Sequence, residues 1–331
     1  MARTTVDTSV QELKGDTLAF YLVTGGAGFI GSHIVEELVQ RGERVRVLDN
    51  LSTGRMANLV HSLQHIDFIK GDLRDLPAVR QAVEGVDYVL HQAALPSVPR
   101  SINDPLTTHT ANTTGTLHLL VAARDAGVGR VVYASSSSVY GDSPSLPKRE
   151  NMLPCPMSPY AVSKLTGEHY CCVFNEVYGL ETVCLRYFNV YGPRQDPISQ
   201  YAAVIPKFIT AMLRGEAPVI YGDGCQSRDF TYVSNVVGAN LLAATVPGVA
   251  GRVLNAACGQ RHSLLDLVAT LNEILGTHFA PVHSDSSPGD VRHSQADITA
   301  AQETIGYRAE VDFEEGVRRT VAWYRAHMIA E

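Results

Sequence analysis

Two residues whose types suit proton transfer, Tyr160 and Lys164, lie four positions apart in the segment SPYAVSKLTGEHY (158–170). The composition of this segment predicts a helix that begins near residues 158–160. A spacing of four places both side chains on one face of that helix. A free phenol has a pKa of about 10, and a neighbouring ammonium lowers it by favouring the phenolate. We therefore expect Tyr160, assisted by Lys164, to act as a base toward a sugar or alcohol hydroxyl.

A run of four serines, residues 135–138, follows the apolar segment RVVYA (130–134), which has the composition of a buried strand. A polar cluster after such a strand is either a flexible linker or part of a site, because α/β proteins bind ligands at the carboxyl ends of their strands. We expect Ser135 to finish the strand and the hydroxyl of Ser136 to lie beside Tyr160.

A glycine-rich segment, TGGAGFIGSHIVEEL (24–38), follows the first apolar run and opens a helix. Gly25, Gly28 and Gly31 have the spacing GxxGxxG. Such glycines permit a tight strand-to-helix turn, a close approach of the backbone to a pyrophosphate, and close packing of the helix on the strand. The helix N-terminus then faces the phosphates with its positive end. An ordinary turn would also fit this segment by itself, so the residues after the next strands matter.

Acidic residues follow the next two strands. The second strand ends VLDN, which contains Asp49, and the third ends KGDLRD, which contains Asp72. A carboxylate at position 49 accepts hydrogen bonds from the adenosine ribose and repels a 2′-phosphate, so it favours NAD over NADP. We expect Asp72 to meet the adenine edge. Together with the glycines, these residues predict an NAD site.

Short apolar runs alternate with amphipathic, helix-length stretches over the first 190 residues, which predicts an α/β fold with a Rossmann-type doubly wound parallel sheet. The expected strands are residues 19–25, 43–50, 66–72, 86–94, 130–137 and 181–189. We predict an NAD-binding domain over residues 1–190, to which elements around 229–258 return. A smaller C-terminal α/β domain for the substrate would occupy mainly residues 191–331. Residues 1–17 form a polar lead-in.

The composition excludes several classes of function. Of the 331 residues 45% are hydrophobic, and the net charge is −7 without any Lys/Arg cluster, unlike a nucleic-acid-binding protein. No apolar run approaches the roughly 20 residues that cross a bilayer, and the N-terminus lacks a signal-peptide pattern. The six cysteines and twelve histidines show no metal-binding spacing. We expect a cytoplasmic enzyme without a metal, a nucleic-acid partner or membrane association.

The chain resembles the extended short-chain dehydrogenase/reductases from about residue 18 to its C-terminus. The likeness rests on TGGAGFIG, HQAA (91–94), YAVSK, LRYFNVYGPRQ (185–195), SRDFTYV (227–233) and GDVRHS (289–294). Within that superfamily it resembles nucleotide-sugar 4-epimerases, and most closely the UDP-N-acetylglucosamine 4-epimerases of the WbpP type. The segments HQAALPSVPRSINDP, RQDPISQYAAVIPK and GDVRHSQADI carry that finer likeness. Pro96 departs from the glycine of that group, near the expected sugar site.

The resemblance implies a set of site residues. Catalysis would rest on Ser136, Tyr160 and Lys164. The cofactor would be NAD, bound by Gly25, Gly28, Phe29, Ile30, Gly31, Asp49, Asn50, Ser52, Thr53, Gly54, Asp72, Leu73, Gln92, Ala93, Ala94, Tyr160, Lys164 and Tyr187. The substrate would be a UDP-sugar, bound by Ser97, Ser137, Ser138, Asn189, Gln195, Ala203, Val204, Lys207, Tyr221, Arg228, Arg292 and Ser294. Arginine suits the diphosphate because its planar fork binds two oxygens at once.

The serine run favours epimerisation over elimination. Related sugar dehydratases carry a carboxylate where this chain has Ser137 or Ser138, and a serine hydroxyl has too high a pKa to replace it as acid or base. The resemblance implies that Tyr160, aided by Ser136, removes the proton of the sugar 4-hydroxyl while hydride passes from C4 to NAD⁺. The 4-keto sugar then turns in the pocket, and hydride returns to the opposite face.

Specificity and assembly also follow from the resemblance. Ser294 matches a position that is a bulky tyrosine in epimerases restricted to non-acetylated sugars, so it leaves room for an N-acetyl group and favours UDP-GlcNAc and UDP-GalNAc. A UDP-glucose or UDP-glucuronic acid 4-epimerase is the alternative enzyme, and a non-catalytic NAD-binding scaffold is the alternative from another class.

The helices expected over 112–126 and 160–178 resemble those that pair between subunits, which implies a homodimer. Their burial against the chain's own sheet is the alternative.

Overall fold

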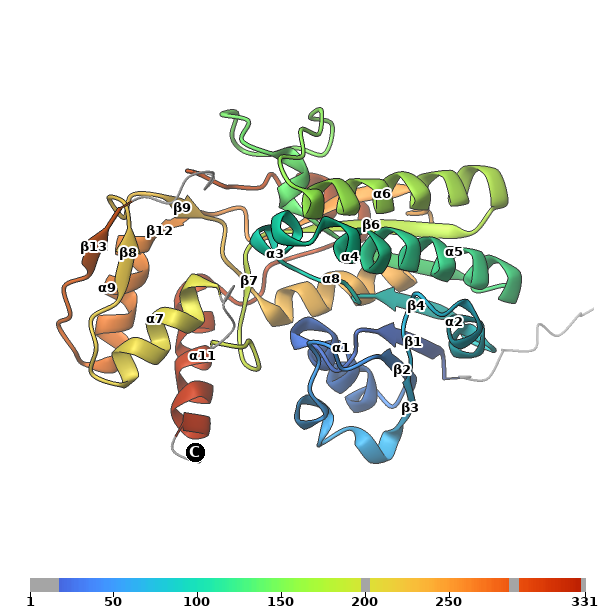
Figure 1. Cartoon of the computed structure of the whole chain (residues 1–331), viewed down its shortest axis with the longest axis horizontal. Helices are drawn as coiled ribbons and strands as arrows, with labels where there is room; N and C mark the ends of the chain where they lie inside the picture. Colours follow the sequence, from blue (N-terminus) through green and yellow to red (C-terminus); the bar gives the residue numbers. More distant parts are fainter. Residues whose placement is uncertain (1–17, 198–202, 286–291, 329–331) are drawn as a thin grey trace, which may run out of the picture.

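The computed structural model describes residues 18–197, 203–285 and 292–328. The polar lead-in expected at residues 1–17 lies outside these residues. The chain forms a large lobe around a central sheet and a smaller lobe beside it, which ends with the C-terminal helix (Figure 1). In the described ranges, no helix combines the length and the apolar character that crossing a membrane requires.

The large lobe is built on a seven-stranded parallel sheet in the order β11-β6-β5-β4-β1-β2-β3. Its strands are β1 (Phe20–Thr24), β2 (Arg44–Asp49), β3 (Ile66–Lys70), β4 (Tyr88–His91), β5 (Arg130–Ser136), β6 (Glu181–Tyr187) and β11 (Arg252–Ala256). The order in the sheet reverses between β1 and β4, so their carboxyl ends flank a crevice of the kind that binds dinucleotides. The Rossmann-type fold predicted from the sequence is confirmed.

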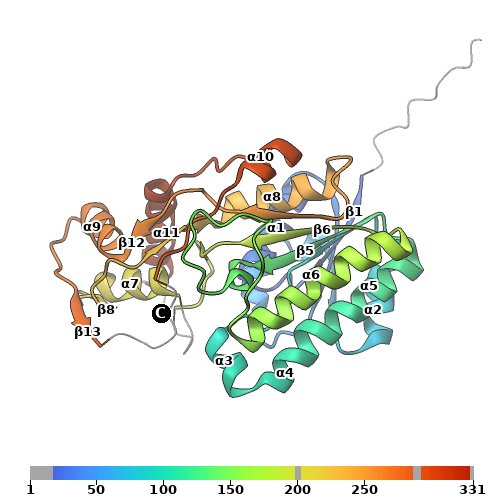
Figure 2. The ribbon, with the colours of Figure 1, turned by 90° about the horizontal axis from the view of Figure 1, so that it is seen from above.

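Helices cover both faces of this sheet, as Figure 2 shows. One face carries α2 (Leu76–Val83), α5 (Gly115–Ala126) and α6 (Pro159–Tyr178), and the other carries α1 (Phe29–Gln40), α8 (Val233–Thr245) and α10 (Thr299–Ile305). Successive strand side chains point to opposite faces, so Leu22 enters the core under α2 and α5 while Val23 enters the core under α1. Burial on both faces explains the apolar character of the central strands β1 and β4, whereas the edge strand β3 carries charged side chains and has no buried residue.

Short helices connect the sheet elements close to its carboxyl edge. After β2 come the 3₁₀ turns η1 (Met56–Leu59) and η2 (Leu63–His65). After β4 come α3 (Val98–Asn103), α4 (Pro105–His109) and a π-helical turn, η3 (Thr110–Thr114), which runs into α5. The serine run itself ends in a 3₁₀ turn, η4 (Ser137–Tyr140). These connections form much of the rim around the crevice.

The smaller lobe has its own apolar core, formed by α7 (Val204–Leu213), α9 (Leu264–Leu275) and α11 (Phe313–Met328) with nearby strands. Three two-stranded sheets accompany these helices: β7 (Val190–Tyr191) with β10 (Thr231–Tyr232), β9 (Ser227–Arg228) with β12 (His262–Ser263), and β8 (Val219–Tyr221) with β13 (Val282–Ser284). Ser263 caps α9 in a capping box with Asp266, which defines where that helix begins.

Candidate active site

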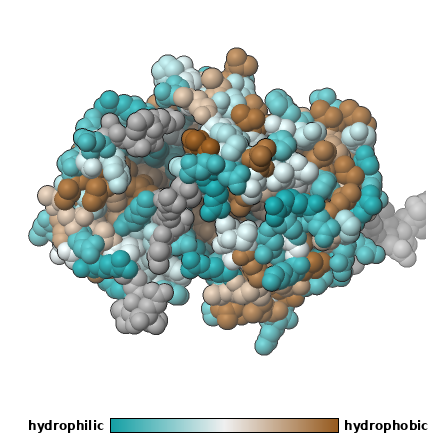
Figure 3. Space-filling model, viewed as in Figure 1, coloured by the Kyte–Doolittle hydropathy of each residue, from teal (hydrophilic) through white to brown (hydrophobic). Residues whose placement is uncertain are grey.

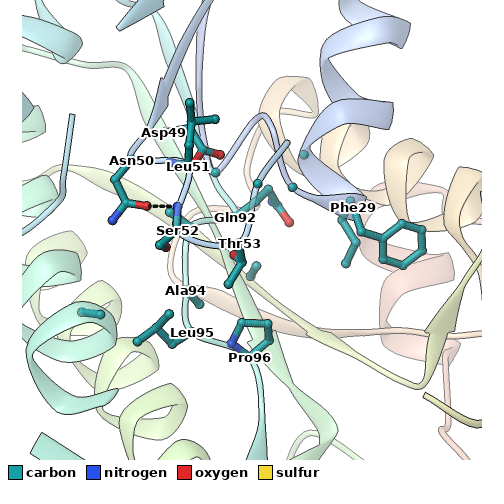
Figure 4. Close-up of a pocket in the computed structure, with 18 of the residues that line it drawn as sticks. Phe29, Asp49, Asn50, Leu51, Ser52, Thr53, Gln92, Ala94, Leu95 and Pro96 are labelled. Atoms are coloured by element: carbon teal, nitrogen blue, oxygen red, sulfur yellow. Dashed lines mark hydrogen bonds between the residues drawn. The ribbon is translucent and has the colours of Figure 1, made fainter. Parts of the chain in front are cut away.

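A cavity of about 830 Å³ opens at the carboxyl edge of the sheet. Every residue predicted to bind the cofactor lines it, from the glycine loop through the segment after β2 to Tyr187 at the end of β6. Figure 4 shows Asp49–Thr53, the segment after β2, beside Ala94–Pro96, the segment after β4. The sequence signals, although far apart in the chain, therefore converge on one cavity.

The glycine loop forms a cradle that side chains would fill. Gly25 has a φ of +69°, and a Cβ there would lie 2.7 Å from the backbone nitrogen of Ala93. A Cβ on Gly31 would clash with the carbonyl oxygen of Gly25. Gly28 caps α1, whose first turn holds no acidic residue and lines the cavity. The exposed backbone and the positive helix end suit a pyrophosphate, so the residues present fit NAD.

Asp49 is held in one orientation at the end of β2. Its two carboxylate oxygens accept the N–H groups of Ala27 at 3.0 Å and Leu51 at 2.8 Å. Burial raises its pKa, and these two bonds lower it. Gly54 packs against it, since a Cβ there would lie 2.9 Å from either oxygen. Each oxygen keeps a lone pair for a ribose hydroxyl, and the negative charge opposes a 2′-phosphate.

Asp72 is engaged by protein groups more fully than the sequence indicates. Its carboxylate accepts hydrogen bonds from Asn50 at 2.7 Å and from the guanidinium of Arg74 at 2.7 and 2.9 Å. The bonds from Arg74 hold its pKa well below the usual range. Asp72 does line the cavity, and its bond to Asn50 orients a second lining residue. A contact with adenine stays a prediction.

Tyr160, Lys164 and Ser136 meet where α6 crosses the end of β5. Ser158 caps α6 by accepting the N–H of Ala161 at 3.2 Å, so the helix begins at the predicted place. The phenol of Tyr160 lies near the hydroxyl of Ser136, which acts to lower the pKa of that phenol. The Nζ of Lys164 lies 5.9 Å from the centre of the Tyr160 ring. The structure thus brings the three predicted catalytic side chains together.

The electrostatics of this group differ from the expectation. Burial lowers the pKa of Lys164, which is 4% exposed, to about 8. Burial also raises the pKa of Tyr160, and the bond with Ser136 lowers it only in part. In the protein by itself, burial therefore outweighs any lowering of the phenol pKa by Lys164, and the expected lowering in the presence of NAD⁺ stays a prediction. Desolvation disfavours both charged forms here and outweighs their attraction.

The four serines have separate environments. Ser135, the inner one, donates a hydrogen bond to Glu168. Ser136, and not Ser135 as expected, ends β5, and it accepts the N–H of Ser138 at 3.2 Å. The hydroxyl of Ser138 is buried and has no hydrogen-bond partner among the described residues. Of the run, only Ser135 lines the cavity, so sugar contacts from Ser137 and Ser138 stay predictions.

Two predicted substrate residues, Gln195 and Ala203, line the cavity. The Oε1 atom of Gln195 is buried without a described partner, so it is free to accept a bond from a ligand. The other predicted substrate residues lie outside the lining: Ser97, Ser137, Ser138, Asn189, Val204, Lys207, Tyr221, Arg228, Arg292 and Ser294. Ser97 instead caps α3 by accepting the N–H of Arg100, and Tyr221 is 58% exposed on the smaller lobe.

Three of these residues nevertheless lie together. The backbone of Ser227 bonds to Arg292 and to Ser294, both at 3.0 Å, which holds the 292–294 segment against β9. The guanidinium of Arg228 donates to the carbonyl oxygen of Arg292 at 3.1 Å. Arg292 also forms an ion pair with Asp223 at 2.8 Å. Residues 289–291 of the GDVRHS motif lie outside the described residues.

Sequence reasoning missed several lining residues, among them Arg55, Arg194 and Asp196. Arg55 and Asp196 form an ion pair at 2.7 Å that joins the loop after β2 to the segment after β7. Arg194 pairs with Glu36 of α1 at 2.6 Å. No local pattern marks such partners, because more than 140 residues separate them in the chain.

Within the described part of the chain, no group of three or more His, Cys, Asp or Glu side chains could hold a metal ion.

The sheet order, the glycine cradle and the Tyr160–Lys164 pair beside the cavity define an extended short-chain dehydrogenase/reductase. The model of the NAD dependent epimerase/dehydratase family matches residues 21–257. The chain belongs to that family. NAD, which the glycine loop and Asp49 predicted, is confirmed as the cofactor.

Similar proteins span three kinds of sugar. The UDP-glucose 4-epimerase of Mycolicibacterium smegmatis is 40% identical over 309 residues, covering 92% of this chain and 98% of that protein. The structure of a UDP-N-acetylglucosamine 4-epimerase from Methanobrevibacter ruminantium M1, in complex with UDP-N-acetylmuramic acid, is 43% identical with a TM-score of 0.90, covering 94% and 100%. That of UDP-glucuronic acid 4-epimerase from Bacillus cereus, in complex with UDP-glucuronic acid and NAD, is 32% identical with a TM-score of 0.86, covering 93% and 99%. The predicted resemblance to nucleotide-sugar epimerases is confirmed.

Proposed function

We propose that this chain interconverts UDP-hexoses that differ in configuration at C4, with UDP-GlcNAc and UDP-GalNAc as the preferred pair. One observation carries this proposal: Tyr160 and Lys164 line a cavity that fits NAD, and the hydroxyl of Ser136 lies near the phenol. A sugar hydroxyl that reached this edge would meet a proton acceptor next to a hydride acceptor. The family and the named activities of the similar proteins support the same reaction.

Bound NAD supplies a reversible hydride acceptor, which takes hydride from C4 and returns it to either face of the resulting ketone. The chain's own residues handle the proton. Tyr160 accepts the proton of the 4-hydroxyl and gives it back, and Ser136 orients that hydroxyl and the phenol. Lys164 places a positive charge near the phenol and favours its ionised form. The hydrogen bond from Lys164 to Ala134 holds this charge in place.

The serine run supports epimerisation over elimination. Removal of water from the sugar requires an acid or base beyond C4, and the hydroxyls of Ser137 and Ser138 cannot serve as one. The carboxylate of Glu168 is bonded to Ser135 and paired with Arg186, so it is not available to the sugar. We infer that the 4-keto sugar is only reduced again, on one face or the other.

The preference for N-acetylated sugars rests on Ser294. This side chain is small and 9% exposed, in the segment held against β9 beside Arg228. In the epimerases that the chain resembles, this position borders the C2 substituent, where a tyrosine excludes an acetamido group. The 43% identity to a UDP-N-acetylglucosamine 4-epimerase supports the same choice. A UDP-glucose or UDP-glucuronic acid 4-epimerase is the alternative, which the similarity to such enzymes favours.

The test is turnover of UDP-GlcNAc, UDP-GalNAc, UDP-glucose, UDP-galactose and UDP-glucuronic acid by the purified chain and by Ser294→Tyr. We expect the unaltered chain to act best on the first two, and the variant to lose that activity while it keeps turnover of UDP-glucose. Turnover of UDP-glucose by the variant is thus a control for its folding and cofactor content. Full turnover of UDP-GlcNAc by Ser294→Tyr would refute the pocket argument, and no turnover of any UDP-sugar would favour a scaffold.

We also propose a division of roles between the two lobes. The sheet lobe would bind NAD, with α8 and β11 contributed from beyond residue 229, and the smaller lobe would bind the nucleotide sugar.

We propose in addition that two copies of the chain form a homodimer. Exposed apolar side chains occur on the outer side of α3, α4 and α6: Ile102 is 61% exposed, Leu106 78%, Val162 50%, Val173 46% and Val177 65%. In the space-filling view, brown apolar areas lie over this part of the molecule (Figure 3). Pairing of two copies through α5 and α6 would cover them.

A further inference from the structure

A buried ion pair lies directly behind the catalytic group. Glu168 of α6 and Arg186 of β6 each have side chains only 4% exposed. They bond at two points, Nε to Oε1 at 2.9 Å and Nη2 to Oε2 at 2.7 Å. A two-point pair of this kind is geometrically specific. Neither residue lines the cavity, so neither touches a ligand there.

The pair contacts the start of the serine run and the end of the turn that follows it. The hydroxyl of Ser135, next to Ser136, donates to the Oε1 atom of Glu168. The guanidinium carbon of Arg186 lies 4.7 Å from the centre of the ring of Tyr140, the last residue of η4. The segment from Ser135 to Tyr140 therefore contacts both members of the ion pair.

Glu168 also shares a helix face with the catalytic residues, because Tyr160, Lys164 and Glu168 follow at intervals of four. Two of the three bond to the end of β5: Lys164 donates to the carbonyl oxygen of Ala134, and Glu168 accepts from Ser135. The Tyr160 phenol lies near the Ser136 hydroxyl of the same strand. The two bonds set the rotation and the height of α6 against the strand, and Glu168 is itself fixed by its ion pair with Arg186.

We infer that Glu168 and Arg186 are positioning residues for the proposed epimerase, which keep the Ser136 hydroxyl aligned with the Tyr160 phenol. This inference rests on the proposed function. The pair acts through Ser135 and through the helix face, and it makes no contact with the sugar. A shift of about 1 Å in such an alignment slows a reaction by ~100-fold, so the effect falls on kcat and leaves KM for the UDP-sugar unchanged.

The test is the double variant Glu168→Met/Arg186→Met. Removal of one partner would leave a buried charge unpaired, whereas replacement of both by apolar groups of similar volume is often neutral or stabilising. We expect a thermal midpoint close to that of the unaltered chain, a kcat lower by ~10- to 100-fold and an unchanged KM. A crystal structure should show a longer distance between the hydroxyl oxygens of Ser136 and Tyr160 than in the unaltered chain.

Arg130 of β5 and Glu181 of β6 offer a control. They pair at 2.6 Å at the amino ends of their strands, away from Ser136, with side chains 7% and 47% exposed. Arg130→Met/Glu181→Met should keep kcat and the Ser136–Tyr160 distance, whatever its stability. Ser135→Ala removes the hydroxyl that bonds to Glu168 and keeps both charges, so it tests the inference even where the double variant does not fold. It should lower kcat without changing KM.

The outcomes are distinct. Unchanged kcat in Glu168→Met/Arg186→Met or in Ser135→Ala, or an unchanged Ser136–Tyr160 distance in the crystal structure of the double variant, would overturn the positioning role. If the unaltered chain turns over no UDP-sugar, the proposed function fails. The crystallographic comparison of the two double variants then decides by itself whether the pair aligns Ser136 with Tyr160.

Discussion

The ammonium of Lys164 donates a hydrogen bond to the backbone carbonyl oxygen of Ala134, at a distance of 2.7 Å. Ala134 lies two residues before Ser136. This bond therefore fixes the charged end of the Lys164 side chain to the strand that carries the Ser136 hydroxyl. Burial lowers the pKa of Lys164 to about 8. A partly desolvated ammonium that is anchored to the backbone is well placed to favour the phenolate of Tyr160 as the proton leaves the sugar.

Lys164→Met removes this charge and keeps much of the side-chain volume. We expect kcat for UDP-hexose epimerisation to fall by ~100- to 10,000-fold, the usual contribution of a proton-transfer group. Lys70→Met, at an exposed lysine in β3 outside the cavity lining, tests whether loss of any lysine has this effect, and it should retain a kcat within a few-fold of the unaltered chain. Steady-state turnover measured from pH 6 to 9 checks both. A kcat in Lys164→Met near that of the unaltered chain would remove Lys164 from the mechanism.

Gly31→Ala should abolish the binding of NAD. Its Cβ would clash with the carbonyl oxygen of Gly25, and backbone cannot move aside as a flexible side chain can. Gly238→Ala is a matched control, since Gly238 also lies inside a helix and a Cβ there meets no atom within 4 Å. The control should be stabilised by about 0.5–1 kcal/mol. Titration with NAD by calorimetry measures both, and equal affinity in the two variants would contradict the cradle.

His91 should make the chain sensitive to acid. Its ring nitrogens lie 2.7 Å from the hydroxyl of Thr24 and 2.9 Å from that of Thr116, and burial lowers its pKa to about 3. The unfolded chain takes up a proton on this ring near pH 6.5. Between pH 6.5 and 3 the unfolded state therefore binds more protons, and the free energy of unfolding falls by up to ~1.4 kcal/mol per pH unit on acidification.

The measurement is urea unfolding from pH 7 to 4 for the unaltered chain and for His91→Gln. The variant should lose this part of the pH dependence, although it is less stable at pH 7 because its partners are buried. His65→Gln, with an exposed side chain, should show the slope of the unaltered chain. Identical slopes in all three proteins would mean that His91 is not the group responsible.

The homodimer is tested by a charge on its proposed surface. Val173→Glu places a carboxylate on α6 where two copies would meet, and burial of an unpaired charge opposes association. Val219→Glu in β8 is the matched control, since both valines are 46% exposed. Light scattering at micromolar concentration should give a dimer for the unaltered chain and the control, and a monomer for Val173→Glu. A monomer mass for the unaltered chain in the same measurement would contradict the proposed homodimer.

Much of the cofactor site is encoded in short segments. The glycines of residues 25–31, the acidic ends of two strands and the Tyr160–Lys164 spacing are patterns whose geometry depends on a few neighbouring residues. Because parallel strands bring their carboxyl ends to one edge, placing these segments after predicted strands also predicted that they meet. The substrate residues were harder, since they lie in loops and paired segments of the smaller lobe whose positions no periodicity reports.

The sequence alone determined the fold and the cofactor and predicted that Ser136, Tyr160 and Lys164 meet, because these features depend on local spacing and on the alternation of strand and helix. Tertiary structure alone decided the partners that hold this group. Glu168, Arg186 and Ser135 come from three separate elements, and no pattern in the chain marks their contact. It also decided the direction of the Tyr160 pKa in the protein by itself, because desolvation depends on everything packed around a side chain and not on its nearest charged neighbour.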